Sequence, residues 1–148
     1  MAWWDKLGMG RRIDAAARVL AAETFTWATV NLGDVLITQL IGRFTVITGG
    51  ASNVHLQHDP TVATAGTAAL CTLANVNGLD VGDSVTITGV PGDPLLVTVT
   101  GGKPGLTIPL ILAPGAIQSV VSAASGAAAI LWSLWYIPLT DGAYVTGI

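Results

Sequence analysis

The feature of this sequence that most constrains its fold is a long uncharged stretch near the C-terminus. No charged residue occurs between Lys103 and Asp141, and the stretch ends in "AAAILWSLWYIPL" at residues 127–139. It is divided into short pieces by prolines and glycines: Pro104, Gly105, Pro109, Pro114, Gly115, Gly126 and Pro138. A membrane-spanning helix needs about 20 continuous apolar residues, and the longest uninterrupted piece, residues 127–137, is about half that length. We therefore expect no transmembrane helix and no membrane partner.

Few charges are available to cover the surface of so small a protein. Charged residues make up 10% of the 148-residue chain, against about 25% in average soluble proteins, and the mean hydropathy is +0.65. A chain of this length suits one domain, and a small domain has a large surface for its volume. Residues 1–20 contain no apolar segment followed by a small-residue cleavage site, so we also expect no secretory signal. We therefore expect much of the surface to be buried against other protein chains.

Residues 1–24 are predicted to form an N-terminal helical arm. Ile13, Ala16, Ala17 and Leu20 fall on one face at helical spacing, which predicts a regular helix over residues 11–22. Two tryptophans, at positions 3 and 4, precede this helix. They are interpreted either as an anchor folded back on the domain or as a plug into a neighbouring subunit.

Residues 25–148 are predicted to form an all-β domain, an antiparallel β-sandwich of jelly-roll-like type. Apolar and polar residues alternate in segments such as "SNVHLQH" and "SVTITGV", which is typical of half-buried strands. The predicted strands recur about every 10–15 residues and are separated by turn residues, as in sandwiches, barrels and jelly rolls. Gly42 interrupts a long strand segment, "DVLITQLIGRFTVITGG", where it predicts a bend or bulge.

The last long strand, within residues 127–139, is apolar on both faces. Alternation places Ile130, Trp132, Leu134 and Tyr136 on one face, and Leu131, Ser133, Trp135 and Ile137 on the other. One face can line the domain core. The other needs cover from a second sheet, the helix or another subunit.

Catalytic and metal-binding patterns are weak in this sequence. His55 and His58 would point to opposite faces of a strand, so with Asp59 they predict no metal site. Asp80, Asp83 and Asp93 lie in turns, where aspartate is common without calcium. No nucleophile elbow or phosphate-binding loop is found, and the single cysteine, Cys71, is interpreted as a buried apolar residue. We expect no enzyme activity, no catalytic residues and no cofactor.

The net charge of −3 and the absence of a basic block argue against a nucleic-acid partner.

The C-terminal segment resembles a family of small structural proteins of tailed-phage virions. These end in a strand of the form G-x-(I/V)-x-W-x-(L/V)-x-Y-x-P-L-(S/T/D)-x-G-A-x-V, and the matching residues here are Trp132, Leu134, Tyr136, Pro138, Leu139, Asp141, Gly142, Ala143 and Val145. The segments "LIGRFTVITGG", "LQHDPT" and "ILAPGAI" are similar to further parts of the pattern. The resemblance covers residues 35–146, and residues 1–24 depart from it.

The resemblance implies an all-β virion component, and within that class it favours a capsid decoration (cement) protein. Such a protein would be made in the host cytoplasm, would act as a homo-oligomer, expected to be a trimer, and would bind the major capsid protein or other virion proteins at the capsid surface. Alternatives are a tail, neck or baseplate component and a module that binds glycans on the host surface. The residues expected at interfaces are Trp3, Trp4, Arg11, Arg12, Arg18, Trp132, Trp135, Tyr136 and Tyr144. For Trp132, Trp135 and Tyr136, core packing is the alternative role, and for the arginines it is a solvated surface.

Overall fold

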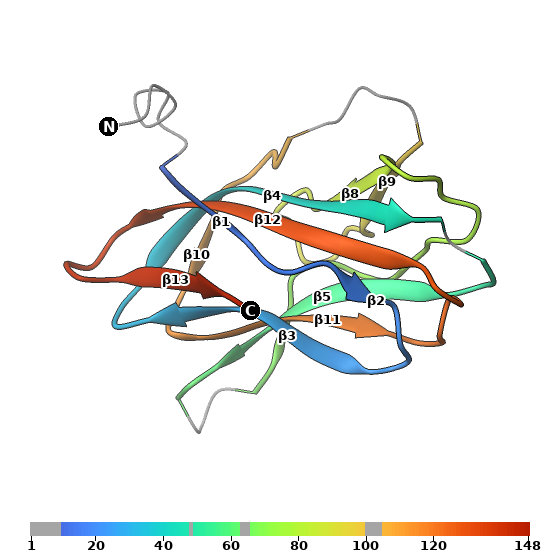
Figure 1. Cartoon of the computed structure of the whole chain (residues 1–148). Helices are drawn as coiled ribbons and strands as arrows, with labels where there is room; N and C mark the ends of the chain where they lie inside the picture. The colour runs from blue at the N-terminus through green and yellow to red at the C-terminus, as the bar shows by residue number, and fades with distance from the viewer. Residues whose placement is uncertain (1–9, 48, 63–65, 100–104) are drawn as a thin grey trace.

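Two antiparallel sheets pack face to face around one hydrophobic core (Figure 1). The computed structural model describes residues 10–47, 49–62, 66–99 and 105–148. Within these ranges every regular element is a strand, and no helix is long and apolar enough to cross a membrane. The prediction of an all-β antiparallel domain is therefore confirmed.

The first sheet has the strand order β1-β12-β4-β8-β9, with β2 paired to β12 and β10 paired to β4. Its strands are β1 (Arg11–Asp14), β2 (Arg18–Val19), β4 (Val35–Val46), β8 (Ser84–Thr86), β9 (Leu96–Thr98), β10 (Leu110–Leu112) and β12 (Ala129–Pro138). The long central strands β4 and β12 pair over their whole length, from Ala129 opposite Val46 to Pro138 opposite Val35.

The second sheet has the order β13-β3-β11-β5-β6, with β7 also paired to β5. Its strands are β3 (Thr24–Asn31), β5 (Asn53–Pro60), β6 (Ala68–Ala69), β7 (Ala74–Asn75), β11 (Gly115–Val121) and β13 (Tyr144–Gly147). From β2 to β5, and again from β10 to β13, each successive strand lies in the opposite sheet. Strands that follow each other in sequence therefore face each other across the core.

Alternation along the strands explains which side chains form that core. In β5 and β11 every second residue is buried, because successive side chains of a strand point to opposite faces. Between the sheets the rings of Trp27 on β3 and Trp132 on β12 stack, with centroids 5.4 Å apart and planes at 17°. These two indoles are among the largest fully buried side chains.

Hydrogen bonds between the two sheets tie both sides of the sandwich together. On one side, Ala16 N–H, in the link between β1 and β2, donates to Ile148 O (2.9 Å) at the end of β13. On the other side, Thr72 N–H donates to Asp93 O (2.7 Å) and Leu95 N–H donates to Thr72 O (3.0 Å). Edge strands that are closed in this way present fewer unpaired backbone groups for open-ended pairing with other chains.

The predicted helix over residues 11–22 is wrong. Residues 11–14 form β1, which pairs with Ser133–Tyr136 of β12, and residues 18–19 form β2, which pairs with Ala129 and Ile130. An isolated helix of this length is marginal in water, whereas an unpaired edge on the apolar strand β12 would leave buried backbone groups unsatisfied. Of the four residues that suggested a helical face, Leu20 is buried and Ile13 packs on the core, whereas Ala16 and Ala17 are exposed.

Gly42 does not form the predicted bulge. It pairs regularly with Trp132 and Val85, while the irregular positions of the β4–β12 pair lie elsewhere, between Ala129 and Ile130 and between Trp135 and Tyr136.

Candidate interaction surface

The outer face of the first sheet carries a continuous apolar strip, which we call the outer strip. It consists of Leu36, Ile41, Ile111, Leu131, Trp135 and Ile137, which come from strands β4, β10 and β12 and are all at least partly exposed. Strand register aligns Ile111, Leu36 and Ile137 in one row across the sheet. Ile111 is 64% exposed. A contiguous apolar patch of this kind is typical of protein interaction surfaces.

The two faces of β12 follow the predicted alternation. Ile130, Trp132, Leu134 and Tyr136 are all buried in the core, whereas Leu131, Trp135 and Ile137 stay partly exposed on the outer face. Ser133, on the same outer face, is buried because its hydroxyl bonds to Asp14 Oδ1 of the neighbouring strand β1.

Arg12 covers part of Trp135 at the middle of the outer strip. These residues are paired across β1 and β12, and the Arg12 guanidinium carbon lies 5.0 Å from the centre of the Trp135 ring. The same guanidinium forms an ion pair with Asp14 at 2.9 Å. Arg12 and Trp135 were both expected at an interface, and the fold brings them together on one exposed face.

Trp132 and Tyr136 lie in the core, with exposed fractions of 2% and 3%. Burial therefore favours their core role over direct contact with another subunit. Neither the Trp132 nor the Trp27 indole N–H has a hydrogen-bond partner. A buried unpaired donor costs about 1–3 kcal/mol, which the stacking and close packing of the two rings must offset.

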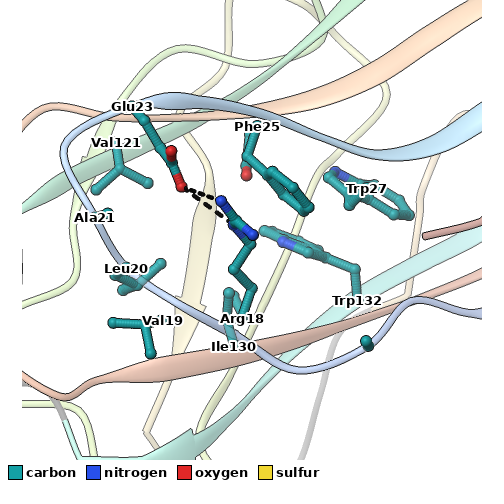
Figure 2. A pocket seen from close by; sticks show the side chains of 12 residues that line it. Arg18, Val19, Leu20, Ala21, Glu23, Phe25, Trp27, Val121, Ile130 and Trp132 are labelled. Carbon is teal, nitrogen blue, oxygen red and sulfur yellow. Dashed lines mark hydrogen bonds and ion pairs between the residues drawn. The ribbon is translucent and has the colours of Figure 1, made fainter.

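Arg18 closes one end of the core beside this tryptophan pair (Figure 2). Its guanidinium lies 3.6 Å from the centre of the Phe25 ring and forms an ion pair with Glu23 at 2.8 Å. The cavity beneath, lined also by Trp27 and Trp132, has a volume of about 10 Å³, which is about the space for a single water molecule. Arg18 thus stabilises the β2 region, and this cavity cannot hold an organic substrate.

Arg11 and Tyr144 meet at a shallow open hollow at the turn between β12 and β13. The hollow has a volume of about 570 Å³ and is also lined by the turn residues from Pro138 to Ala143, including Asp141. Tyr144 is 39% exposed there. Trp3 and Trp4, the remaining predicted interface residues, lie outside the described residues.

Titratable side chains do not converge on a reactive site in the described part of the chain. No group of three or more His, Cys, Asp or Glu residues in that part could hold a metal ion. His55 and His58 lie on opposite faces of β5. The carboxylates of Asp83 and Asp93 bond to nearby turn groups, namely Asp80 N–H (2.9 Å) and the Thr88 hydroxyl (2.7 Å).

His58 and Cys71 are buried groups with shifted pKa values. Burial lowers the pKa of His58, against opposing effects of a hydrogen bond with the Ala113 backbone and of the Asp59 charge, and His58 Nε2 has no partner. Burial raises the pKa of the Cys71 thiol, and its sulfur accepts a 3.3 Å hydrogen bond from Leu56 N–H. Both groups face the core rather than a cleft, so their surroundings are structural.

Sequence reasoning missed Leu36, Ile41 and Ile111 as members of the exposed strip. Alternation within each strand could have placed them on outward faces, but their alignment with Trp135 and Ile137 depends on strand register. Register comes from pairings between residues that are far apart in the chain.

Comparisons with known proteins give little further information. No model of a known protein family matches the chain, and no curated protein matches it. One solved structure is similar, described as "Structure of infectious bursal disease virus Gx strain", with 16% sequence identity and a TM-score of 0.21. The similarity covers 92% of this chain and 39% of that one, and a TM-score this low carries no argument about function.

Proposed function

We propose that this protein is a structural component of a virus particle, and that the outer strip is the surface through which it binds other protein chains. The observation that carries the proposal is the strip itself, an apolar outer sheet face on a chain with only 10% charged residues. Such a face, rather than a reactive cleft, is what a protein needs if it works by burying surface against neighbours.

The strand order supports a jelly roll. Within the seven-stranded and six-stranded sheets, the series β1-β12-β4-β8 and β3-β11-β5-β6 make a set of eight strands in two sheets. Eight strands in two sheets are also found in the double-sheet jelly rolls of viral capsid and lectin domains. Fold alone does not determine function. The strand order of this protein agrees, however, with the resemblance of residues 35–146 to tailed-phage virion proteins.

Within that class, the function that we favour is a capsid decoration (cement) protein. It would be made in the host cytoplasm and then bind the major capsid protein at the capsid surface, as a homo-oligomer that the resemblance suggests is trimeric. Burial of apolar surface stabilises such contacts by about 25 cal/mol per Å² before the costs of association. Many weak contacts of this kind would stiffen a shell without catalysis, a cofactor or nucleic-acid binding.

Binding to particles tests this proposal directly. The full chain would be mixed with undecorated particles of the virus that encodes it and separated by sedimentation. We expect co-sedimentation that is saturable and that decreases when Trp135 is replaced by Ser, while the exposed residue Val81, replaced by Ser, serves as the control. Particles that retain no chain at saturating concentration would refute the decoration role.

A tail, neck or baseplate position is the nearest alternative, because the same fold and the same apolar face would serve in a smaller ring. The number of copies per particle separates the two positions.

A glycan-binding role is a second candidate, favoured by one specific observation. The hollow at the β12–β13 turn combines a partly exposed aromatic ring, Tyr144, with the charged residues Arg11 and Asp141. Aromatic faces and charged hydrogen-bonding groups together suit sugar recognition. A glycan array probed with the full chain tests this, and array signals that survive Tyr144→Ala would exclude this hollow.

A further inference from the structure

The outer strip has opposite charges at its two ends. Asp34 directly precedes β4 and is exposed, and Arg43 is exposed near the other end of the same strand. Both residues alternate with core residues, Asp34 with Val35 and Arg43 with Phe44, so they share the outer face with the strip. Nine residue steps at about 3.3 Å each separate them by about 30 Å.

Neither of these end charges is neutralised within the described part of the chain. The ion pairs formed there are Arg12 with Asp14 and Arg18 with Glu23, and they include neither Asp34 nor Arg43. The centre of the strip, in contrast, adds no net charge, because Arg12 over Trp135 is already paired with Asp14. The face therefore has an unpaired anion at one end, an unpaired cation at the other, and mainly apolar side chains around the polar, uncharged Gln39 between them.

We propose that the occupant of the outer strip is the same strip of a second copy of this chain, related by a two-fold axis near Trp135. The midpoint between Asp34 and Arg43 on β4 lies next to Gln39, which is the register partner of Trp135 on β12. Rotation by 180° about an axis through that point lays β12 antiparallel to its copy. Asp34 of each chain then meets Arg43 of the other, and the apolar residues between them face each other.

This arrangement is self-complementary, as a two-fold contact requires. A parallel arrangement would place like charges together at both ends, which is unfavourable. The proposal deepens the proposed function and rests on it in one respect, namely that the strip is a protein contact. With the two-fold contact alone, the closed product is a dimer. If threefold contacts of the kind suggested by the resemblance also form, the closed product is a pair of trimers. Both assemblies contain an even number of chains.

The strip is small for a stable dimer. About 30 Å of length and two to three strands of width, spaced about 4.8 Å apart, give a few hundred Å² on each copy, whereas stable interfaces bury about 800 Å² per partner. We therefore expect a contact that is weak in dilute solution and more populated at the high local concentration of an assembled particle.

Charge exchange tests the register of this contact. Sedimentation velocity of the full chain, over a concentration range of about 1 to 500 µM in low salt, should show a reversible shift to an even-numbered species. Arg43→Asp alone and Asp34→Arg alone each place like charges at both ends of the pair, so each should raise the dissociation constant about tenfold or more. An equimolar mixture of the two variants restores opposite charges at both ends and should associate at least as tightly as the wild type.

Matched controls separate this register from general charge effects. Asp59→Arg changes a partly exposed charge on β5 of the second sheet, away from the strip, and this variant should associate like the wild type. Ile111→Thr should weaken association, whereas Leu73→Thr, at an apolar side chain that is 57% exposed and lies between β6 and β7 of the second sheet, should not.

Three results would each overturn the two-fold proposal. They are a wild-type chain that stays monomeric at every concentration, a wild-type chain that forms only odd-numbered species, and charge variants that fail to associate with each other. None of these results would affect the decoration role if the chain still binds particles. Conversely, a chain that pairs as described but does not bind particles would retain the two-fold contact and lose the proposed function.

Discussion

Gly42 shows how a single residue makes room for the core. It pairs with Trp132 across β4 and β12, and a Cβ atom at this position would lie 2.6 Å from Trp132 Cζ3 and 2.7 Å from Val85 Cγ2. Real side-chain contacts are not this short. The glycine is therefore explained by the volume of the indole opposite it rather than by backbone conformation.

Replacement of Gly42 by Ala should lower the free energy of unfolding by about 1–3 kcal/mol, because overpacking forces side chains away from their preferred rotamers. Urea denaturation measures this change. Gly92→Ala is the control, since a Cβ there meets no atom within 4 Å, and its effect should be small. Equal stabilities of the two variants would contradict the steric role of Gly42.

His58 makes the stability of the fold depend on pH. Burial lowers its pKa in the folded state below the usual value of 6.5, so the unfolded chain binds a proton more readily. Stability is then complete above about pH 6.5 and decreases as the pH falls below that value. The groups that act on His58 in the opposite direction, the Ala113 backbone and Asp59, only reduce this effect.

The His58→Gln variant should therefore lose less stability than the wild type between pH 7.5 and pH 5.5, as measured by thermal or urea unfolding at each pH. His55→Gln provides a comparison, because His55 is less buried and its pKa is lowered by burial alone. A His58→Gln variant whose stability keeps the wild-type pH dependence would show that this histidine is not the source.

At the scale of elements, alternation predicted strands between residues 24 and 139 but not β1, β2 or β13. In β5, β11 and β12 the local pattern and the sheet agree, because one face of each strand meets the core. Residues 11–19 have a local pattern that suits a helix, and their extended form depends on the edge of β12, more than a hundred residues away in sequence. A single-sequence pattern cannot reveal that edge.

The same reason limits what could be predicted of the interaction surface. The period of one strand placed Trp135 and Ile137 on the face opposite Trp132 and Tyr136, without deciding which face lines the core. Ile111 joins them only because β10 pairs with β4 in a particular register, which no local pattern determines.

Proline substitutions test the strand form of the N-terminal segment. Ala15 is buried, and its N–H donates to Trp132 O at 2.9 Å, so Ala15→Pro should lower the free energy of unfolding by about 3 kcal/mol or more. Ala17 is exposed in the link between β1 and β2, and Ala17→Pro should have a much smaller effect. A helix over residues 11–22 would be disrupted by both substitutions alike, so equal losses of stability would contradict the pairing of β1 with β12.

At the scale of the whole molecule, the low charge content and the paired edges of the two sheets together limit how the chain can associate with other chains. Hydrogen bonds between the sheets satisfy backbone groups on both sides of the sandwich, so the chain is not expected to associate by open-ended strand pairing. Other exposed apolar residues, such as Leu32 and Val81, lie in turns, whereas those of the outer strip share one sheet face. Association should therefore occur face to face and stop at a defined number of chains.

The measurement that most directly tests the central claim is the number of copies of this chain in purified particles of the virus that encodes it, determined by quantitative mass spectrometry against isotope-labelled peptides. A decoration protein should be present at about the abundance of the shell's repeating units, in hundreds of copies, while a dozen or fewer would place the chain in the tail or neck. Particles that contain no copies would contradict a structural role in the virion.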